Sequence, residues 1–246
     1  MKGLLNMTQI TTCTFFKLDS SSAKWWAFKQ MQLGHYSLKN VQGLTFSKIL
    51  GSGAKNGFSV IPNFGTYVLL CVWNSEKNAE DFFKENSFFK TYKSKSTECF
   101  TVYSNAAESH GLWDNKQPFK KSAKLENNQP VLVLTRARIR FLKLLSFWSK
   151  VGKVSHSLEK YDGVLVSIGV GEWPLIQQAT ISIWQTQAEM MDYAYKNEAH
   201  KKVIHLTRKL NWYKEELFAR FVPYKFEGKW NGKDVSDLIS KDTSIE

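Results

Sequence analysis

Apolar and polar residues follow two different periods along this chain. Short apolar runs predict β-strands at residues 11–18 and 131–139. Segments with apolar residues at every third or fourth position predict amphipathic helices at residues 25–38 and 142–159. Each half of the chain therefore opens with a strand and then a helix.

The two halves continue in the same way after these elements. A strand follows a glycine, and the next strand ends at a tryptophan, Trp73 in the first half and Trp184 in the second. A polar turn then begins a second amphipathic helix. A last strand is predicted at residues 99–103 in the first half and 217–222 in the second. This order, β-α-β-β-α-β, is that of the ferredoxin-like unit.

Matching residues recur at a nearly constant spacing, which indicates a duplication. The pairs separated by 111 residues are Trp73 and Trp184, Phe82 and Tyr193, and Phe89 and His200. Downstream, the sequence Gly-Leu-Trp at 111–113 matches Gly-Lys-Trp at 228–230 with an offset of 117. We therefore predict an α+β fold in which tandem ferredoxin-like repeats form, within one chain, an α+β barrel of the dimeric type with its helices outside.

The predicted repeats set the expected domain boundaries. The first repeat occupies residues 1–115 and the second residues 130–232. Between them, residues 116–129 form a polar linker rich in asparagine and lysine, and residues 233–246 form a polar tail.

Composition is that of an ordinary folded protein. The chain has 246 residues, of which 43% are hydrophobic and 23% charged. Its three cysteines, Cys13, Cys71 and Cys99, form no C-x-x-C pair and are expected to be reduced thiols inside the cell. The longest apolar run, at 67–73, is far shorter than the roughly 20 residues of a membrane-spanning helix. We expect a cytoplasmic protein, with at most peripheral contact at the inner membrane face.

Charge is the feature of composition that predicts a partner. There are 34 lysines and arginines against 22 acidic residues, a net charge of +12, which favours an anionic partner. Only five of the cations are arginines, and no zinc-finger, RNP or helix-turn-helix pattern is present. We therefore expect no nucleic-acid binding. Attraction to an anionic membrane surface and a merely solvated basic surface both remain open.

His200 is the one histidine with a distinctive position. It belongs to the apolar stripe of Met190, Tyr193 and Ile204 on the last predicted helix, where the first half carries Phe89. A hydrogen-bonded core histidine and a metal ligand are both compatible with this position. His205 lies about 140° around the helix and cannot share a small site with it. A single inward imidazole is what a haem needs as its axial ligand.

Arginines alternate along the predicted strand at 131–139 and just beyond it. Arg136, Arg138 and Arg140 therefore lie on one face of this strand. They form either an exposed polar face or a row of guanidinium groups that binds carboxylates, such as the propionates of a haem. The glycine-rich stretch at 51–57 lacks the spacing of a phosphate-binding loop, so we expect it to be a flexible loop.

Several longer motifs carry a resemblance to a known family. They are VLTRARI at 133–139, GVGEWP at 169–174, QATISIW at 178–184, WYKEELFARF at 212–221 and, in the first half, WAFKQM at 26–31. These motifs resemble those of the spheroidene monooxygenase family, the acyclic carotenoid ketolases, over nearly the whole chain from about residue 11 to 232.

The resemblance implies an O2-dependent carotenoid monooxygenase that contains haem b. Such an enzyme hydroxylates C-2 near the end of a carotenoid, and a second hydroxylation with loss of water gives a ketone. The resemblance also implies a ferredoxin-type electron donor. By analogy with haem proteins of this barrel, it makes His200 the axial iron ligand, with Arg136 and Arg138 as further cofactor-binding residues; it assigns no other catalytic residue.

Two other functions remain open at this point. One is another haem enzyme of the same barrel, such as a peroxidase or an aldoxime dehydratase. The other is a cofactor-free barrel that binds a hydrophobic ligand.

Overall fold

The two halves of the chain repeat one order of strands and helices. The computed structural model describes residues 8–54, 61–151, 161, 163–173, 175–196 and 198–234, with the side chains of 151, 198–200 and 202–204 left out. The first half contains β1 (Ile10–Lys17), α1 (Ser21–Leu38), β2 (Leu44–Gly53), β3 (Pro62–Trp73), α2 (Glu76–Glu85), α3 (Ser87–Lys95) and β4 (Glu98–Gly111). The second half contains β5 (Val131–Ile139), the 3₁₀-helix η1 (Phe141–Lys143), α4 (Leu144–Val151), β6 (Val164–Trp173), β7 (Gln177–Trp184), α6 (Gln187–Lys196), α7 (Glu198–Leu210), β8 (Tyr213–Trp230) and β9 (Lys233–Asp234).

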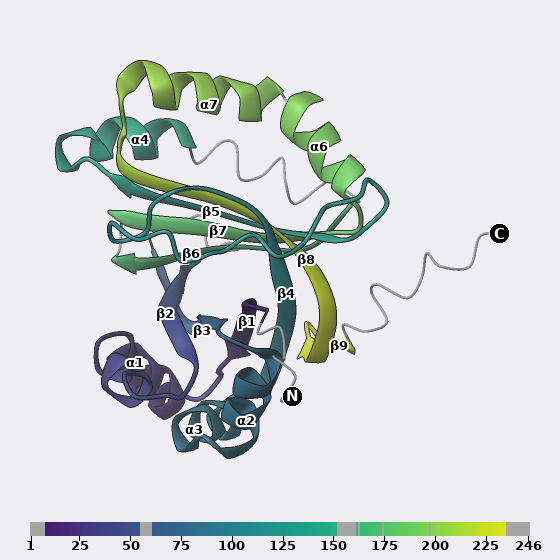
Figure 1. Cartoon of the computed structure of the whole chain (residues 1–246). Helices are drawn as coiled ribbons and strands as arrows, with labels where there is room; N and C mark the ends of the chain where they lie inside the picture. Colours follow the sequence, from purple (N-terminus) through teal and green to yellow (C-terminus); the bar gives the residue numbers. More distant parts are fainter. Residues whose placement is uncertain are drawn as a thin grey trace.

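The strands form a closed antiparallel barrel. Their order is β4-β1-β3-β2-β6-β7-β5-β8, and β8 pairs back to β4, while β9 only extends β8 as a hairpin. Helices α1, α2 and α3 cover the half of the barrel built by β1–β4, and α4, α6 and α7 cover the other half (Figure 1). Within the described residues, no helix combines the length and hydropathy needed to cross a membrane. The predicted α+β barrel of two ferredoxin-like repeats is confirmed.

Strand register shows how closely the halves correspond. Trp73 lies opposite Ile10, and Trp184 lies opposite Val131. The Trp73 ring packs on Phe82 at 5.0 Å between centroids, and the Trp184 ring packs on Tyr193 at 5.3 Å. The two indole N–H groups each donate a hydrogen bond of 2.9 Å to a hydroxyl oxygen, of Thr12 and Ser182 respectively. The aromatic pairs therefore perform the same packing role in both halves.

Some elements differ from their predicted extents. The last strands are much longer than expected, because β4 and β8 pair with each other over eleven residue pairs and this pairing includes polar positions. The second helix of the first half is broken at Asn86, whose side chain accepts hydrogen bonds from the Phe88 and Phe89 N–H groups and so begins α3. The second half also has two helices here, so the prediction of one helix with a continuous apolar stripe is wrong: Met190 and Tyr193 lie on α6, whereas His200 lies on α7. The helix predicted at 142–159 is described only as η1 and α4, because residues 152–160 lie outside the described residues.

The segment predicted as a polar linker packs on the barrel. Phe119 is buried in the barrel core, and its ring lies edge-on against Phe221 at 4.9 Å. Nearby, the backbone N–H groups of Ser122 and Ala123 both donate to the Ala106 carbonyl. Backbone hydrogen bonds and the buried Phe119 ring therefore hold the connection between the repeats against the barrel.

Two glycines allow β4 and β8 to approach each other. Gly111 and Gly228 have φ angles of 86° and 98°, and a Cβ at either would collide with a carbonyl oxygen of the facing strand, that of Glu216 or Cys99. The two positions are related by the offset of 117, so the same constraint occurs once in each repeat.

Gly228→Ala is expected to lower the free energy of unfolding by about 3 kcal/mol, because it adds a backbone clash to the cost of a left-handed φ. The matched control is Gly232→Ala, where φ is 76° but no atom lies within 4 Å of the added Cβ. That variant should lose only about 1 kcal/mol. Urea unfolding of both proteins gives the comparison, and equal losses would show that the close approach is not the constraint.

Candidate functional site

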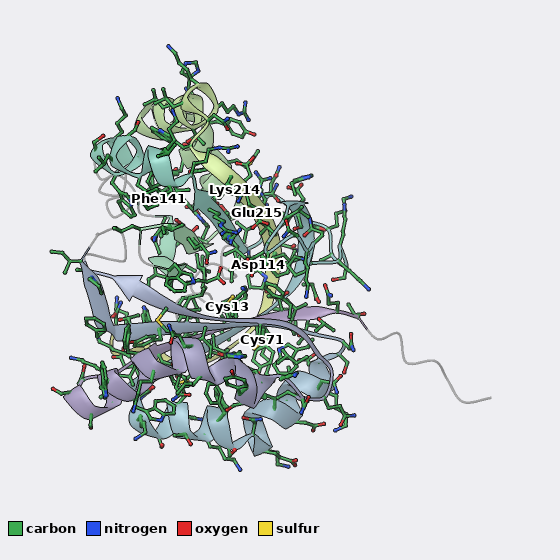
Figure 2. All side chains as sticks on the ribbon, turned by 90° about the vertical axis from the view of Figure 1, so that its left-hand side faces the viewer. Cys13, Cys71, Asp114, Phe141, Lys214 and Glu215 are labelled. Atoms are coloured by element: carbon green, nitrogen blue, oxygen red, sulfur yellow. The ribbon has the colours of Figure 1, made fainter. Side chains whose placement is uncertain are left out.

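The second half differs from the first at two places, inside the barrel and on the outer face of the sheet. Inside the barrel lies a cluster of five charged residues, which we call the charge cluster: Lys48, Asp114, Arg136, Glu172 and Glu215. Arg136 is only 1% exposed and pairs with Glu215, and its Nη2 lies 3.5 Å from Asp114 Oδ1 and 3.6 Å from Glu172 Oε1. Lys48 pairs with both Asp114 and Glu172. Asp114 and Glu215 lie close together in Figure 2.

Strand alternation places Arg136 in the barrel. Leu132 and Leu134 of β5 belong to the interior core, and Arg136 continues their face. The strand register gives Arg136 the position that Phe15 occupies in the first half. Its guanidinium carbon lies 5.4 Å from the Trp113 ring centroid, an arrangement in which the aromatic face stabilises the cation.

Glu215 and Trp113 hold the cluster to the turn that follows β4. The Glu215 carboxylate accepts hydrogen bonds from the backbone N–H groups of Asp114 and Asn115, at 3.1 and 2.9 Å. Burial acts to raise the pKa of Glu215, but the hydrogen bonds from Asn115, Arg136 and Asp114 outweigh it and hold this pKa below its usual value. The Trp113 indole donates to Glu172 at 2.7 Å.

A simpler version of this arrangement surrounds Glu98 in the first half. Glu98 accepts hydrogen bonds from the N–H groups of Asn231 and Gly232, at 2.8 and 2.9 Å, but its cationic partner is the half-exposed Lys17 at 3.6 Å. The local sequence pattern does not single out Glu215, but the internal repeat does. Glu98 and Glu215 share the offset of 117 that relates the two Gly-x-Trp motifs.

The structure separates the residues that the sequence proposed as one haem site. Arg136 lies inside the barrel, Arg138 is half-buried, and Arg140 is exposed. Helix α7, which carries His200, covers the outer face of the sheet (Figure 1), and the side chain of His200 lies outside the described residues. A haem placed against α7 would have the β5 backbone between it and the Arg136 guanidinium, whose charge three protein carboxylates already compensate.

The outer face of the sheet carries smaller side chains in the second half. In the first half, the cross-strand pairs Phe16–Tyr67 and Ile49–Leu69 lie beneath the helices. The equivalent pairs of the second half are Ala137–Gln178 and Gly169–Thr180. The sheet therefore contributes far less side-chain volume beneath α4, α6 and α7.

The buried apolar residues reflect this change. Beneath α1, α2 and α3 they form one continuous cluster. In the second half, the described ones fall into two groups, one around Trp184 and Tyr193 and the other around Phe147 and Trp212. The substituted pairs lie on the part of the outer sheet face between these two groups.

A cavity of about 740 Å³ lies at the junction between β2 and β6, beside α1, and residues of both halves line it. These strands pair only through Gly51–Gly171 and Ser52–Val170. The apolar lining of the cavity includes Phe28, Met31, Ile49, Phe64 and Trp173, and Lys48 and Glu172 of the charge cluster also line it. The weak junction thus leaves an apolar cavity beside the buried ion pairs.

The described residues do not contain a group of three or more histidine, cysteine or acidic side chains positioned for a metal ion. The cysteines are unpaired thiols. Burial raises the pKa of Cys13 to about 12 and that of Cys99 to about 11, and it raises the pKa of Cys71 as well. These thiols therefore stay protonated and are poor nucleophiles or iron ligands at neutral pH.

Comparison with solved structures defines the class of the fold. Two crystal structures of aldoxime dehydratase, one in complex with butyraldoxime, superpose with a TM-score of 0.58 at 8% identity; the matches cover 91% and 94% of this chain and 84% and 86% of those chains. At this identity the likeness concerns the fold alone. The protein is thus an α+β barrel built from two ferredoxin-like repeats in one chain.

Sequence comparison identifies the family. Spheroidene monooxygenase of Cereibacter sphaeroides is 33% identical over 227 residues, which cover 92% of this chain and 70% of the relative. The Rhodobacter capsulatus enzyme is 31% identical over 96% of this chain and 99% of its own length, and the Rubrivivax gelatinosus enzyme is 31% identical over 86% and 81%. No protein-family model matches the chain. The chain belongs to the spheroidene monooxygenase family and is a monooxygenase, as the sequence motifs indicated.

Proposed function

We propose that this protein is a haem-dependent carotenoid monooxygenase that inserts oxygen at C-2, near the end of a carotenoid. Its membership of the spheroidene monooxygenase family supports a carotenoid as the substrate. A cofactor in the second half is supported by one observation. The sheet beneath α4, α6 and α7 carries smaller side chains than the matching sheet of the first half.

The position of His200 fits a haem in this space. In the first half, Phe89 of α3 is buried and faces Phe16 of β1, with 6.1 Å between ring centroids. The duplication places His200 at the position of Phe89 and Ala137 at that of Phe16. By this sequence equivalence, an imidazole and a methyl group would stand where the first half has two facing aromatic rings, and they would supply a nitrogen ligand and room for a porphyrin.

Each part of the site has a distinct role in this proposal. Haem, when bound, supplies the activation of O2 that C–H hydroxylation requires. His200 would hold its iron. Trp184 and Tyr193 at one end, and Phe147 and Trp212 at the other, form apolar walls that exclude water and position a hydrocarbon. Arg138 follows Arg136 on the barrel face of β5, so this proposal assigns neither arginine to a propionate of a haem on the outer face.

Electrons and substrate have to reach this site from outside. We propose a reduced ferredoxin-type protein as the electron donor, because a monooxygenase consumes two electrons for each oxygen atom it inserts. Carotenoids reside in bilayers, so the protein would act at an anionic membrane surface, to which its net charge of +12 is attracted.

The test is expression in a carotenoid-producing host, together with absorption spectroscopy of the purified protein. We expect a haem Soret band and a carotenoid whose mass has increased by one oxygen atom, for an alcohol, or by one oxygen less two hydrogens, for a ketone. A protein that stays colourless when supplied with hemin, in a host whose carotenoids are unchanged, would contradict the proposal and favour a cofactor-free barrel.

A further inference from the structure

Three large apolar side chains protrude from η1 and α4. Phe141, Leu142 and Leu145 are 75%, 92% and 90% exposed. The opposite side of the same segment is also apolar: Phe147 is buried, and Leu144 packs with it against Trp212. A segment that is apolar on both faces buries one against its own protein and leaves the other for a partner.

A second exposed apolar group lies on α1 and β3. The rings of Trp25 and Phe28 stack at 5.7 Å between centroids, and Phe28 meets Phe64 edge-on at 5.4 Å. Trp25 is 62% exposed, and both phenylalanines line the mouth of the cavity between α1 and the β2–β6 junction. Phe28 and Phe64 therefore form part of the cavity wall, and Trp25, stacked on Phe28, extends this apolar group over the adjacent surface.

Contacts around the β6–β7 turn join the two groups. Trp173, 59% exposed, and Leu175 line the other side of the cavity. The Trp148 indole of α4 donates a hydrogen bond to the Leu175 carbonyl at 3.1 Å. Helices α1 and α4 lie on the same side of the barrel (Figure 1), and with that side facing the viewer both α1 and Phe141 are visible (Figure 2). The cavity thus opens between two protruding apolar groups.

The charges of these helices have one sign. Residues 21–39 and 140–151 contain no aspartate or glutamate. Their cations are Lys24, Lys29, Lys39, Arg140, Lys143 and Lys150. By contrast, α2, at the far end of the first half, contains four acidic residues within its ten. The cationic charge therefore flanks the exposed apolar groups, as in proteins that bind the surface of an anionic membrane.

We propose that this side of the molecule, which we call the α1–α4 face, docks on an anionic lipid bilayer. Phe141, Leu142 and Leu145 enter the boundary between headgroups and acyl chains, while the lysines and Arg140 contact lipid phosphates. The cavity then opens toward the acyl chains, from which an apolar substrate can enter without crossing water. Only this last step rests on the proposed function, because docking itself requires no carotenoid and no haem.

The experiment is flotation of the full chain with vesicles of phosphatidylcholine, with or without phosphatidylglycerol. We expect binding to the anionic vesicles, weaker binding to the neutral ones, and loss of binding at about 1 M salt, where the screening length falls to roughly 3 Å. Leu142→Gln/Leu145→Gln should weaken binding at least about tenfold. These side chains are almost fully exposed, so the melting temperature should not change.

Matched controls distinguish an effect of the α1–α4 face from a general effect of hydrophobicity or net charge on vesicle binding. Tyr195→Gln on α6 removes an exposed apolar side chain elsewhere and should leave binding unchanged. Lys143→Gln/Lys150→Gln should weaken binding, whereas Lys84→Gln/Lys90→Gln on α2 and α3 reduces the net charge equally and should not. Equal effects of the two lysine pairs would overturn the assignment of the face.

Two further results would overturn the proposal. One is an absence of binding to anionic vesicles. The other is concentration-dependent self-association that Leu142→Gln/Leu145→Gln abolishes, which would make the α1–α4 face an interface between copies. Vesicle binding without carotenoid oxygenation would support docking and contradict the proposed function. Oxygenation of detergent-dispersed carotenoid without vesicle binding would support the proposed function and contradict docking.

Discussion

Replacing Glu215 by glutamine is expected to lower the free energy of unfolding by about 4 kcal/mol, because it leaves the buried Arg136 guanidinium without its nearest counter-charge. Arg136 is 1% exposed, and its remaining carboxylates lie 3.5 and 3.6 Å away. Its Nε and Nη2 already lack hydrogen-bond partners, so little compensation is available. Chemical denaturation of the purified protein measures the loss.

The duplicated chain offers a matched control for this variant. Glu98→Gln disturbs the equivalent turn, which follows β8, but Lys17, the cationic partner of Glu98, is 40% exposed. This variant should cost only about 1 kcal/mol, since an exposed ion pair contributes little. The double variant Arg136→Met/Glu215→Gln should be more stable than Glu215→Gln alone, because it removes the buried cation that has lost its hydrogen-bonded carboxylate. Equal losses for Glu98→Gln and Glu215→Gln would contradict the role of Arg136.

The stability lost in Glu215→Gln also depends on pH. The pKa of Glu215 is lower in the folded protein than the value of about 4.3 expected in the unfolded chain. The ionised carboxylate therefore contributes stability above about pH 4.3, and this contribution is lost as the pH falls through the folded-state pKa. The difference between the wild type and Glu215→Gln should shrink on acidification, and denaturation across this range measures it.

His200→Ala is expected to remove haem and oxygenation together. Loss of the axial ligand should exceed the roughly 10- to 100-fold loss of affinity that follows removal of an outer-shell partner. The Soret absorbance of the purified protein and a hemin titration measure binding, and added imidazole should restore part of it. His205→Ala is the control, because His205 is exposed on the same helix, about 140° away from His200. Wild-type haem content in His200→Ala would contradict the assignment.

The local hydrophobic pattern was sufficient to predict the limits of β5, which are 131–139 in both the prediction and the structure. It was insufficient for β4 and β8, because their ends are paired by each other rather than by an apolar run of their own. The same limit applies to the charge cluster. The alternation of Arg136, Arg138 and Arg140 gave their common face, but not that Arg136 would meet carboxylates from 22 residues upstream and 79 residues downstream.

By itself, the sequence determined the repeated order of elements, the α+β barrel and the family, because periodicity, internal offsets and motifs are properties of neighbouring or equivalent positions. Only the tertiary structure decided which side of the sheet each group occupies. It placed Arg136 inside the barrel and α7 outside it, and it brought α1 and α4 to the same side around a cavity. The physical reason is barrel closure. The pairing of β4 with β8 and of β2 with β6 joins residues more than 100 positions apart, and no local pattern encodes those distances.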